Sequence, residues 1–279
     1  MKSTGIQKLC AFFMLGLTIF WALLMYYNIT DGTQNYVFSV LTNIIPLVGG
    51  IAIIAGAKEW KGQSKLIYRG LICMGLGLIF WAFGGTIWSY YNFFLHMDVP
   101  YPSIADIGYA PSEFFYCFGA VYLSRGAGAD LGIQKKYAKP LMVIIPIIMF
   151  IFSYYILITV GKSGVLFTST DPLLKTILDL IYPIGDFISL TVSVVISGLY
   201  FEFLAKKYRW GIIIVLFGLT AMFFSDFVFS YTTTRGTYFN GNFSDWLSTA
   251  SLFLLAFGSL YFLETKEKTP AVTSSANSN

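Results

Sequence analysis

Long runs of apolar residues recur along the whole chain, separated by short segments that hold most of its charged residues. A run of about 18 or more apolar residues can cross the core of a bilayer as a helix. The runs are solid rather than alternating, which favours helices over the strands of a membrane barrel. The pattern therefore predicts eight transmembrane helices, at residues 9–27, 36–56, 68–94, 104–125, 139–160, 172–202, 209–231 and 244–263.

Composition supports the same class. Of the 279 residues, 56% are hydrophobic and only 11% are charged, whereas soluble domains carry about 25% charged residues. Such a chain cannot cover a globule with water-facing side chains, so we expect an all-α polytopic membrane protein whose first partner is the lipid bilayer. Three cysteines without a CxxC pair and a single histidine indicate neither a metal site nor a disulfide framework.

The basic residues predict the orientation. Their clustering in particular loops explains the net charge of +4 as a topology signal, and we expect no nucleic-acid partner. Cytoplasmic loops of membrane proteins are enriched in Lys and Arg. One set of alternate segments carries fifteen basic residues and the other only Lys162, Lys175 and Arg235. Both termini are therefore expected in the cytoplasm, with the protein in the cytoplasmic membrane.

An internal repeat is visible in the sequence. Residues 68–94 align with 209–231 at an offset of 141, and residues 104–125 align with 244–263 at an offset of 139. The matched pairs include Pro46 with Pro183, Gly77 with Gly218, Ser89 with Ser230, Tyr90 with Tyr231, Asp106 with Asp245 and Gly119 with Gly258. Because the order is the same in both halves, we expect a duplicated 4+4 parallel repeat. Its units are residues 1–137 and 138–263, followed by a disordered cytoplasmic tail at 264–279.

Acidic residues in the predicted spans are the main candidates for function. Acids within a membrane are costly and usually face the interior of the bundle. The only nearby cations expected to pair with them are Lys175 and Arg235. Asp106 and Asp245 lie at helix starts, where a carboxylate can also act as an N-cap. The deeper acids Glu113, Asp186 and Asp226 fit either interhelical hydrogen bonds or a site for a ligand, proton or ion. The candidate ligand-binding residues are Asp106, Glu113, Asp186, Asp226, Asp245, Tyr90, Tyr109 and Tyr231.

The tyrosines have two interpretations. They fit an aromatic belt at the membrane interface, and they also fit a cage above the acids for an apolar or cationic ligand. No residue pattern names a cofactor, and no metal ligand set is expected.

Three stretches carry a family resemblance: PSIADIGYAPSEFFYCFGAVYL (102–123), IYPIGDFISL (181–190), and the segment from SDFVFSY to FGSLYF (225–262). In this order they resemble the eight-helix integral-membrane sensory region found N-terminal to bacterial diguanylate cyclase, cyclic-di-GMP phosphodiesterase and histidine kinase domains. The resemblance implies an input module whose motif positions are Pro102, Ser103, Asp106, Asp186, Asp226 and Asp245. Two departures stand out. Gly84 and Gly85 occupy a place where family members often carry an acid, and no effector domain follows, so the output is expected to pass through a separate partner.

Four functions remain open from these patterns. The leading expectation is a stand-alone sensory or ligand-binding module with an outward-facing acidic and aromatic cavity. A proton or cation transporter or channel would use the same acids, although the cytoplasmic halves of the helices are expected to hold almost no buried polar groups. A weaker resemblance to lysoplasmalogenase-like membrane hydrolases rests on the pairs Gly185-Asp186 and Ser225-Asp226. The fourth function is a structural subunit of a membrane complex. No P-loop, nucleophile elbow or HExxH motif occurs, so an enzyme is the less favoured class.

Overall fold

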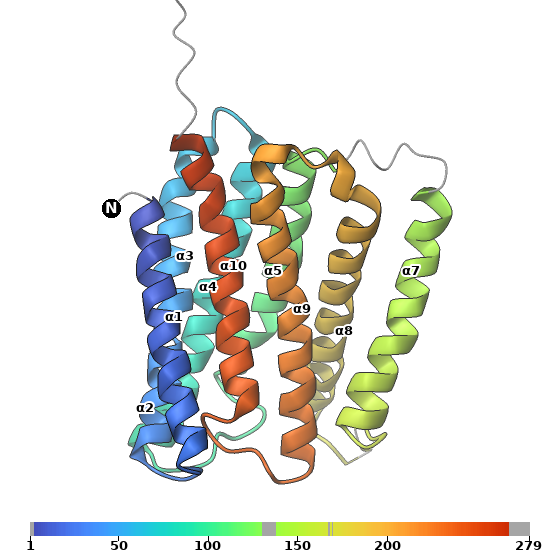
Figure 1. The fold of residues 1–279 in the computed structure, drawn as a ribbon. Helices are drawn as coiled ribbons and strands as arrows, with labels where there is room; N and C mark the ends of the chain where they lie inside the picture. The colour runs from blue at the N-terminus through green and yellow to red at the C-terminus, as the bar shows by residue number, and fades with distance from the viewer. Residues whose placement is uncertain (1–2, 130–137, 167, 169, 268–279) are drawn as a thin grey trace, which may run out of the picture.

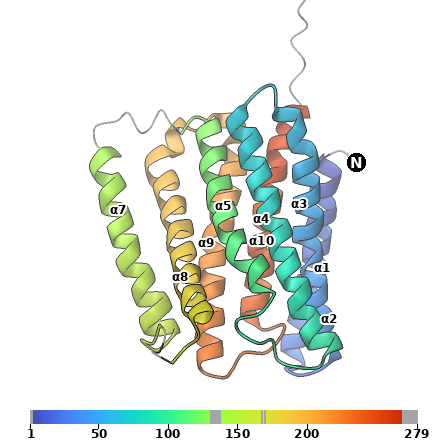
Figure 2. The same cartoon turned by 180° about the vertical axis from the view of Figure 1, so that it is seen from behind.

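Helices standing side by side form a single bundle in the computed structural model (Figures 1 and 2). The structure describes residues 3–129, 138–166, 168 and 170–267, and no strand occurs among them. The long helices are α1 (Ser3–Tyr26), α2 (Thr33–Thr42), α3 (Ile44–Ala57), α4 (Lys65–Ser89), α5 (Asp106–Gly126), α7 (Ala138–Ser153), α8 (Leu173–Val195), α9 (Lys206–Thr234) and α10 (Phe243–Glu267). Short helical segments extend several of them: η1 (Lys58–Trp60), η2 (Tyr90–Phe94), η3 (Tyr154–Gly161), η4 (Ile196–Tyr200) and η5 (Phe201–Phe203).

Seven helical segments are long and apolar enough to cross a membrane: Thr4–Tyr26, Thr33–Trp60, Lys65–Phe94, Ala138–Gly161, Leu173–Phe203, Lys206–Thr234 and Phe243–Glu264. They confirm a multi-pass membrane architecture. The fourth predicted span is α5, which is helical but is not among the seven. It packs against α4, α8 and α9. Its polar side chains, such as Glu113 and Ser112, are therefore buried in protein and not in lipid.

Apolar side chains cover the outside of the bundle. On α7, Val143, Ile147 and Ile151 follow one another at intervals of four residues and are 62%, 55% and 63% exposed. Residues four apart lie on one helical face. An exposed apolar face of this kind suits the hydrocarbon of a bilayer and is rare on soluble monomers.

The predicted second span is interrupted at Asn43, which separates α2 from α3. Pro46 lies in the first turn of α3 and has no N–H to donate to Thr42, the residue four positions earlier. The Asn43 side chain contributes to the break, because its Nδ2 donates to the carbonyl of Ser39 at 2.9 Å. The remaining predicted spans agree with the helices to within a few residues.

The two ends of the bundle differ in their connections. The start of α1 and the end of α10 lie at one end, together with the connections at 58–64 and 201–205; we call this the proximal end (Figure 1). The distal end holds the connections at 27–32, 95–105, 162–166 and 235–242 (Figure 1). The α10 helix continues to Glu267, so the first residues of the predicted tail are helical, whereas residues 268–279 lie outside the described part.

Glycines allow two helix pairs to approach closely. A Cβ added to Gly119 of α5 would lie 2.7 Å from the Met74 side chain and 3.1 Å from its backbone nitrogen on α4. A Cβ on Gly258 of α10 would lie 2.8 Å from the carbonyl of Gly211 and 2.9 Å from the nitrogen of Val215 on α9. Small residues at such points let helix backbones pack at short distance in membranes.

Candidate functional site: a buried carboxyl cluster

Three carboxyl side chains from three helices meet inside the bundle. Glu113 comes from α5, Asp186 from α8 and Asp226 from α9. The carboxyl groups of Asp186 and Asp226 are in hydrogen-bonding contact, and Glu113 lies within electrostatic range of both. Glu113 and Asp186 are only 3% and 4% exposed, and Asp226 is partly buried. We call these three residues the carboxyl cluster.

The hydrogen bonds around the cluster are incomplete. The Ser189 hydroxyl donates to Glu113 Oε2 at 3.3 Å and lies 3.1 Å from Cys117 Sγ. Glu113 Oε1 and Asp186 Oδ1 are buried without a hydrogen-bond partner among the described residues. Buried polar atoms are normally satisfied, and leaving one unpaired costs about 1–3 kcal/mol. Two such oxygens on interacting carboxyl groups indicate a site that favours a proton.

Local sequence explains how α8 brings its acid to the cluster. Gly185 lies against Glu113, and a Cβ at this glycine would be 3.1 Å from Glu113 Cβ. A side chain at 185 would press on Glu113, so this glycine lets α5 and α8 approach closely where the two acids lie. Pro183 lies inside α8 and removes one backbone hydrogen bond just before this turn.

Polar side chains continue from the cluster along one face of α8. Asp179, Tyr182, Asp186, Ser189 and Ser193 are spaced three or four residues apart, which places them on one helical face. Toward the distal end, Tyr182 donates its hydroxyl proton to Asp106 Oδ1 at 2.5 Å. Toward the proximal end, Ser193 donates to the carbonyl of Leu216 on α9 at 3.2 Å. We call these five residues the polar line of α8.

The proximal halves of the helices, which the basic residues predict to be cytoplasmic, are more polar than the sequence predicts. Ser193 on α8, Ser124 on α5 and Ser259 on α10 are 3%, 1% and 0% exposed. The expectation that these halves hold almost no buried polar groups is therefore wrong. Hydroxyl groups are short enough to be enclosed by neighbouring apolar residues, so a count of charged residues does not detect them.

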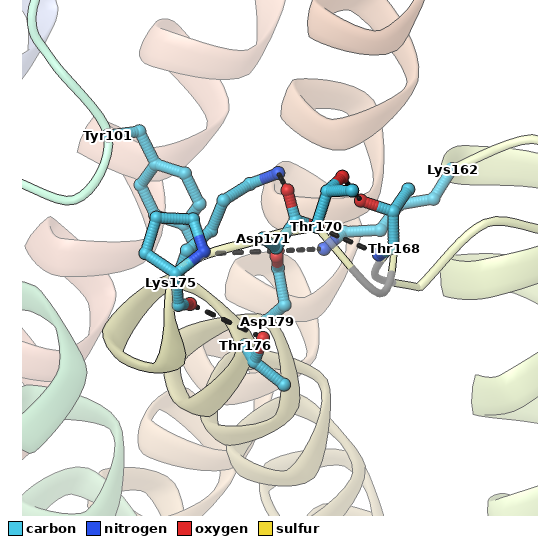
Figure 3. Close-up of polar contacts among 9 residues, drawn as sticks. Tyr101, Lys162, Thr168, Thr170, Asp171, Lys175, Thr176 and Asp179 are labelled. Carbon is cyan, nitrogen blue, oxygen red and sulfur yellow. Dashed lines mark hydrogen bonds and ion pairs between the residues drawn. The ribbon is translucent and has the colours of Figure 1, made fainter.

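The distal end of the polar line is an ion pair (Figure 3). Lys162 Nζ lies 2.6 Å from Asp179 Oδ1, and the Tyr101 hydroxyl donates to the same oxygen at 3.3 Å. Burial and the nearby Asp179 and Asp106 carboxylates raise the pKa of Tyr101 well above its usual value, so this hydroxyl stays a donor. Asp179 is only 5% exposed, and a lysine from the preceding loop neutralises its charge.

The two cations expected to pair with the acids lie elsewhere. Lys175 binds Asp171 at 2.7 Å, and its hydrogen bond lowers the pKa of that carboxyl (Figure 3). Arg235 lies over the ring of Tyr231, 3.5 Å from its centroid. Neither reaches the carboxyl cluster, because each is held by a closer partner within its own segment.

Asp106 and Asp245 occupy equivalent positions at helix starts. Asp106 Oδ2 accepts from the backbone N–H of Ser103 at 2.7 Å, three residues earlier, in the geometry of a capping box. Asp245 Oδ2 accepts from the N–H of Gly241 at 2.7 Å, while Asn242 Oδ1 accepts from the N–H of Ser244. Both acids thus have a capping role in the local structure.

Each of these two capping acids also has a tyrosine partner. Tyr182 donates to Asp106, and Tyr238 donates to both oxygens of Asp245 at 3.2 Å. Tyr109 lies within electrostatic range of Asp106 and Asp245, between the two helix starts. The two acids and their tyrosine partners therefore lie near one another, although no hydrogen bond among the described residues joins the two pairs.

Tyr90 and Tyr231 are not brought to the acids. Tyr90 is 50% exposed and packs against Phe94, and Tyr231 is 38% exposed under Arg235. Their positions are typical of an aromatic belt at the surface of the bundle.

A cavity of about 410 Å³ opens at the distal end, and none of the eight candidate residues lines it. Its wall includes Asp31, Asp98, Trp88, Phe229 and Tyr238. The lining of this distal cavity thus differs from the candidate residues that the sequence suggested. The only signal in the sequence was acids in the distal loops, and nothing there indicated that separate segments converge.

No group of three or more His, Cys, Asp or Glu side chains within the described residues has an arrangement that could hold a metal ion. No protein-family model matches the sequence, and neither a curated protein nor a solved structure matches it significantly.

Proposed function

We propose that this protein is a multi-pass membrane sensory module that binds a proton at the carboxyl cluster. The binding state would pass to a separate partner protein as a change in the packing of α5, α8 and α9. The observation that carries the proposal is the pair of buried oxygens without partners, Glu113 Oε1 and Asp186 Oδ1, beside a third carboxyl at Asp226.

The electrostatics of the cluster support this proposal. Three ionised carboxyls in a low-dielectric interior repel one another strongly, so neighbouring carboxyls share protons or bind a cation. No ion pair joins the cluster to a Lys or Arg of the described residues, in contrast to Asp179. Occupancy of the cluster therefore changes the interaction between the three helices that supply its acids.

The arrangement of the two halves supports a duplicated 4+4 unit, with residues 1–137 and 138–263 as its copies. Met74 corresponds to Val215 in the sequence alignment, and Gly119 corresponds to Gly258. Gly119 packs closely against Met74, and Gly258 packs closely against Val215 in the same way. Ser103 and Asn242 correspond as well, and both stand three residues before a capping acid. The cluster itself is not duplicated, because Asp186 aligns with Gly49 and Asp226 with Gly85.

The orientation belongs to the same proposal. The segments rich in Lys and Arg lie at the proximal end, which we place in the cytoplasm of the cell by the positive-inside rule. The partner would then contact the proximal end, where both ends of the described chain lie (Figure 1).

A second candidate function is proton or cation transport, favoured by the polar line of α8. Its hydroxyl and carboxyl groups extend from the distal Lys162–Asp179 pair past the cluster to Ser193. Chains of such groups are typical of proton relays in membrane proteins.

One set of variants tests both candidates. Thermal unfolding of the purified protein is followed across pH, with added sodium or potassium as a comparison, because a proton that binds only the folded state raises the melting temperature. We expect the wild type to respond, and Glu113→Gln, Asp186→Asn and Asp226→Asn to lose the response. The matched control, Asp245→Asn, alters a capping acid outside the cluster and should respond as the wild type does.

A wild-type melting temperature that does not change with pH would overturn the proposal. An equal loss of response in Asp245→Asn would do the same. Flux measured in proteoliposomes separates the two candidates: a flat trace under proton and cation gradients favours the sensor, whereas a flux that Asp186→Asn abolishes favours the transporter.

A further inference from the structure

The distal cavity is separate from the carboxyl cluster and has its own chemistry. Its volume of about 410 Å³ lies within the range of about 300–1,000 Å³ that pockets for small organic ligands occupy. Its wall is formed by the connection before α2, by α2 itself, by α4 with η2, by the connection before α5, by α9 and by the connection before α10. A ligand there would touch both halves of the chain.

Three aromatic rings form a corner in the wall of the cavity. Trp88 meets Phe229 at 72° and Tyr238 at 89°, with ring centroids 6.1 Å and 6.2 Å apart. Phe229 and Tyr238 meet at 78° with centroids 5.1 Å apart. The rings contact one another and leave no space for an ion between them, but a ring in the wall of a cavity can attract an ammonium ion that lies against its face.

The charge of the cavity has a single sign. Asp31 and Asp98 line it and are exposed at its mouth, and no Lys, Arg or His belongs to its lining among the described residues. The nearest distal cations are held elsewhere, because Arg235 lies on Tyr231 and Lys162 on Asp179. The cavity therefore attracts cations and repels anions.

Hydrogen bonds hold the wall in place. Asn240 Oδ1 accepts from Trp88 Nε1 at 3.0 Å and from Asn92 Nδ2 at 3.4 Å. Asn35, only 1% exposed, donates through Nδ2 to the carbonyl of Asn240 at 2.8 Å and to that of Ile29 at 3.0 Å. These bonds fix the ring of Trp88 before any ligand binds, which lowers the entropic cost of binding.

We propose that the distal cavity binds a small organic ammonium ion between the aromatic corner of Trp88, Phe229 and Tyr238 and the carboxylates of Asp31 and Asp98. Tyr238 also donates its hydroxyl to Asp245, so the ligand would contact a side chain that is hydrogen-bonded to the capping acid of α10. The proposal does not depend on the carboxyl cluster, because no cluster residue lines the cavity.

Calorimetric titration of the full chain in nanodiscs of phosphatidylglycerol tests this site with three probes of similar size: butylammonium, butanol and butyrate. We expect saturable binding of butylammonium alone. The double variant Asp31→Asn/Asp98→Asn should weaken it by about tenfold or more. Phe229→Leu, which removes a ring without removing a hydrogen bond of the described residues, should weaken it as well.

Asp171→Asn is the matched control, because Asp171 lies at the same end, outside the cavity and paired with Lys175. Its affinity for butylammonium should equal that of the wild type. The absence of saturable binding by the wild type, equal binding of butanol, or an equal loss in Asp171→Asn would each overturn the proposal.

The ammonium group could belong to a soluble amine or to the headgroup of phosphatidylethanolamine. Nanodiscs that contain phosphatidylethanolamine distinguish the sources. A lower apparent affinity for butylammonium in those discs supports the site and assigns it to the lipid headgroup, and an unchanged affinity supports it as a site for soluble amines. Binding that persists when Glu113→Gln abolishes the response of the cluster would establish the cavity independently of the proposed function.

Discussion

At the scale of single residues, the same side chain type has three different environments. Asp179 is neutralised by Lys162, Asp106 accepts from a backbone N–H and from Tyr182, and Asp186 faces another carboxyl. A buried charge is tolerated only when it is paired, hydrogen-bonded or protonated. The first two environments correspond to pairing and hydrogen bonding, and the third is the one on which the proposed function rests.

The ion pair at the end of the polar line carries a prediction. Lys162→Met leaves Asp179 buried without its cation, and this should lower the free energy of unfolding by up to about 3 kcal/mol, the lower end of the range for breaking a buried pair, because Lys162 is partly exposed. The measurement is thermal unfolding in detergent, where a fall of several degrees is expected. The matched control Lys175→Met removes the i,i+4 pair with Asp171, which is at the surface, and should change the melting temperature very little.

The double variant Lys162→Met/Asp179→Asn should recover part of the loss, since it removes the unpaired charge. Equal destabilisation by Lys162→Met and Lys175→Met would contradict the assignment of a buried pair.

At this scale the sequence predicts the type of residue in the site but not its partners. Acids in apolar segments indicated interior positions for Glu113 and Asp186, which are 3% and 4% exposed. The expectation of Lys175 and Arg235 as their cations was wrong, because a cation selects whichever carboxylate the fold brings closest. Lys162 reaches Asp179 from a loop seventeen residues earlier, and its own span gives no sign of this contact.

At the scale of helices, hydropathy predicts well where each helix lies, but it does not predict where the regular α-helix is interrupted. Each predicted span is helical, but the second breaks at Asn43, and π-helical segments follow the regular α-helix at Tyr90–Phe94 and Tyr154–Gly161. The break at Asn43 depends on single side chains such as Pro46, which a hydropathy average over many residues does not detect.

Helix pairing gives a second prediction. A Cβ on Gly108 of α5 would meet only backbone on α4: the carbonyl of Phe80, the nitrogen of Gly84 at 2.5 Å and its Cα at 2.8 Å. Backbone cannot rotate away, so Gly108→Ala should destabilise the protein by about 1–3 kcal/mol or more. Gly16→Ala on α1 is the control, because nothing lies within 4 Å of its added Cβ; it should be neutral or stabilising by up to about 1 kcal/mol.

Thermal unfolding of the two variants beside the wild type checks this prediction. A Gly108→Ala protein as stable as Gly16→Ala would show that α4 and α5 do not pack as closely as described.

At the scale of the whole molecule, exposed apolar faces and the distribution of basic residues act together. Outer helices such as α7 present apolar residues to the surroundings, and α5 does so with Ile107 and Phe118, while its polar residues Ser112 and Glu113 are buried. The bundle thus places the polar side chains of α5 where lipid does not reach them, which explains how a segment of lower apolarity can belong to a membrane-embedded fold.

The orientation is testable with single cysteines. Gly62→Cys places a thiol in the proximal connection between α3 and α4, and Val165→Cys places one at an exposed site of the distal end. Because basic segments stay in the cytoplasm, a membrane-impermeant thiol reagent should label Val165→Cys in intact cells and Gly62→Cys only after the cells are opened.

The unmodified chain serves as the background for this labelling, since Cys10 and Cys117 are buried and Cys73 is partly buried. The reverse pattern of labelling would invert the topology and place the distal cavity in the cytoplasm.

By itself the sequence determined the class of this protein, the positions of its helices and the residue types of its interior. The reason is that insertion into a bilayer depends on the length and apolarity of each segment, and both are local properties. Tertiary structure alone decided that Glu113, Asp186 and Asp226 meet, that Lys162 pairs with Asp179, and that Trp88, Phe229 and Tyr238 enclose a cavity. These residues are far apart along the chain, so only the packing of whole helices brings them within reach of one another.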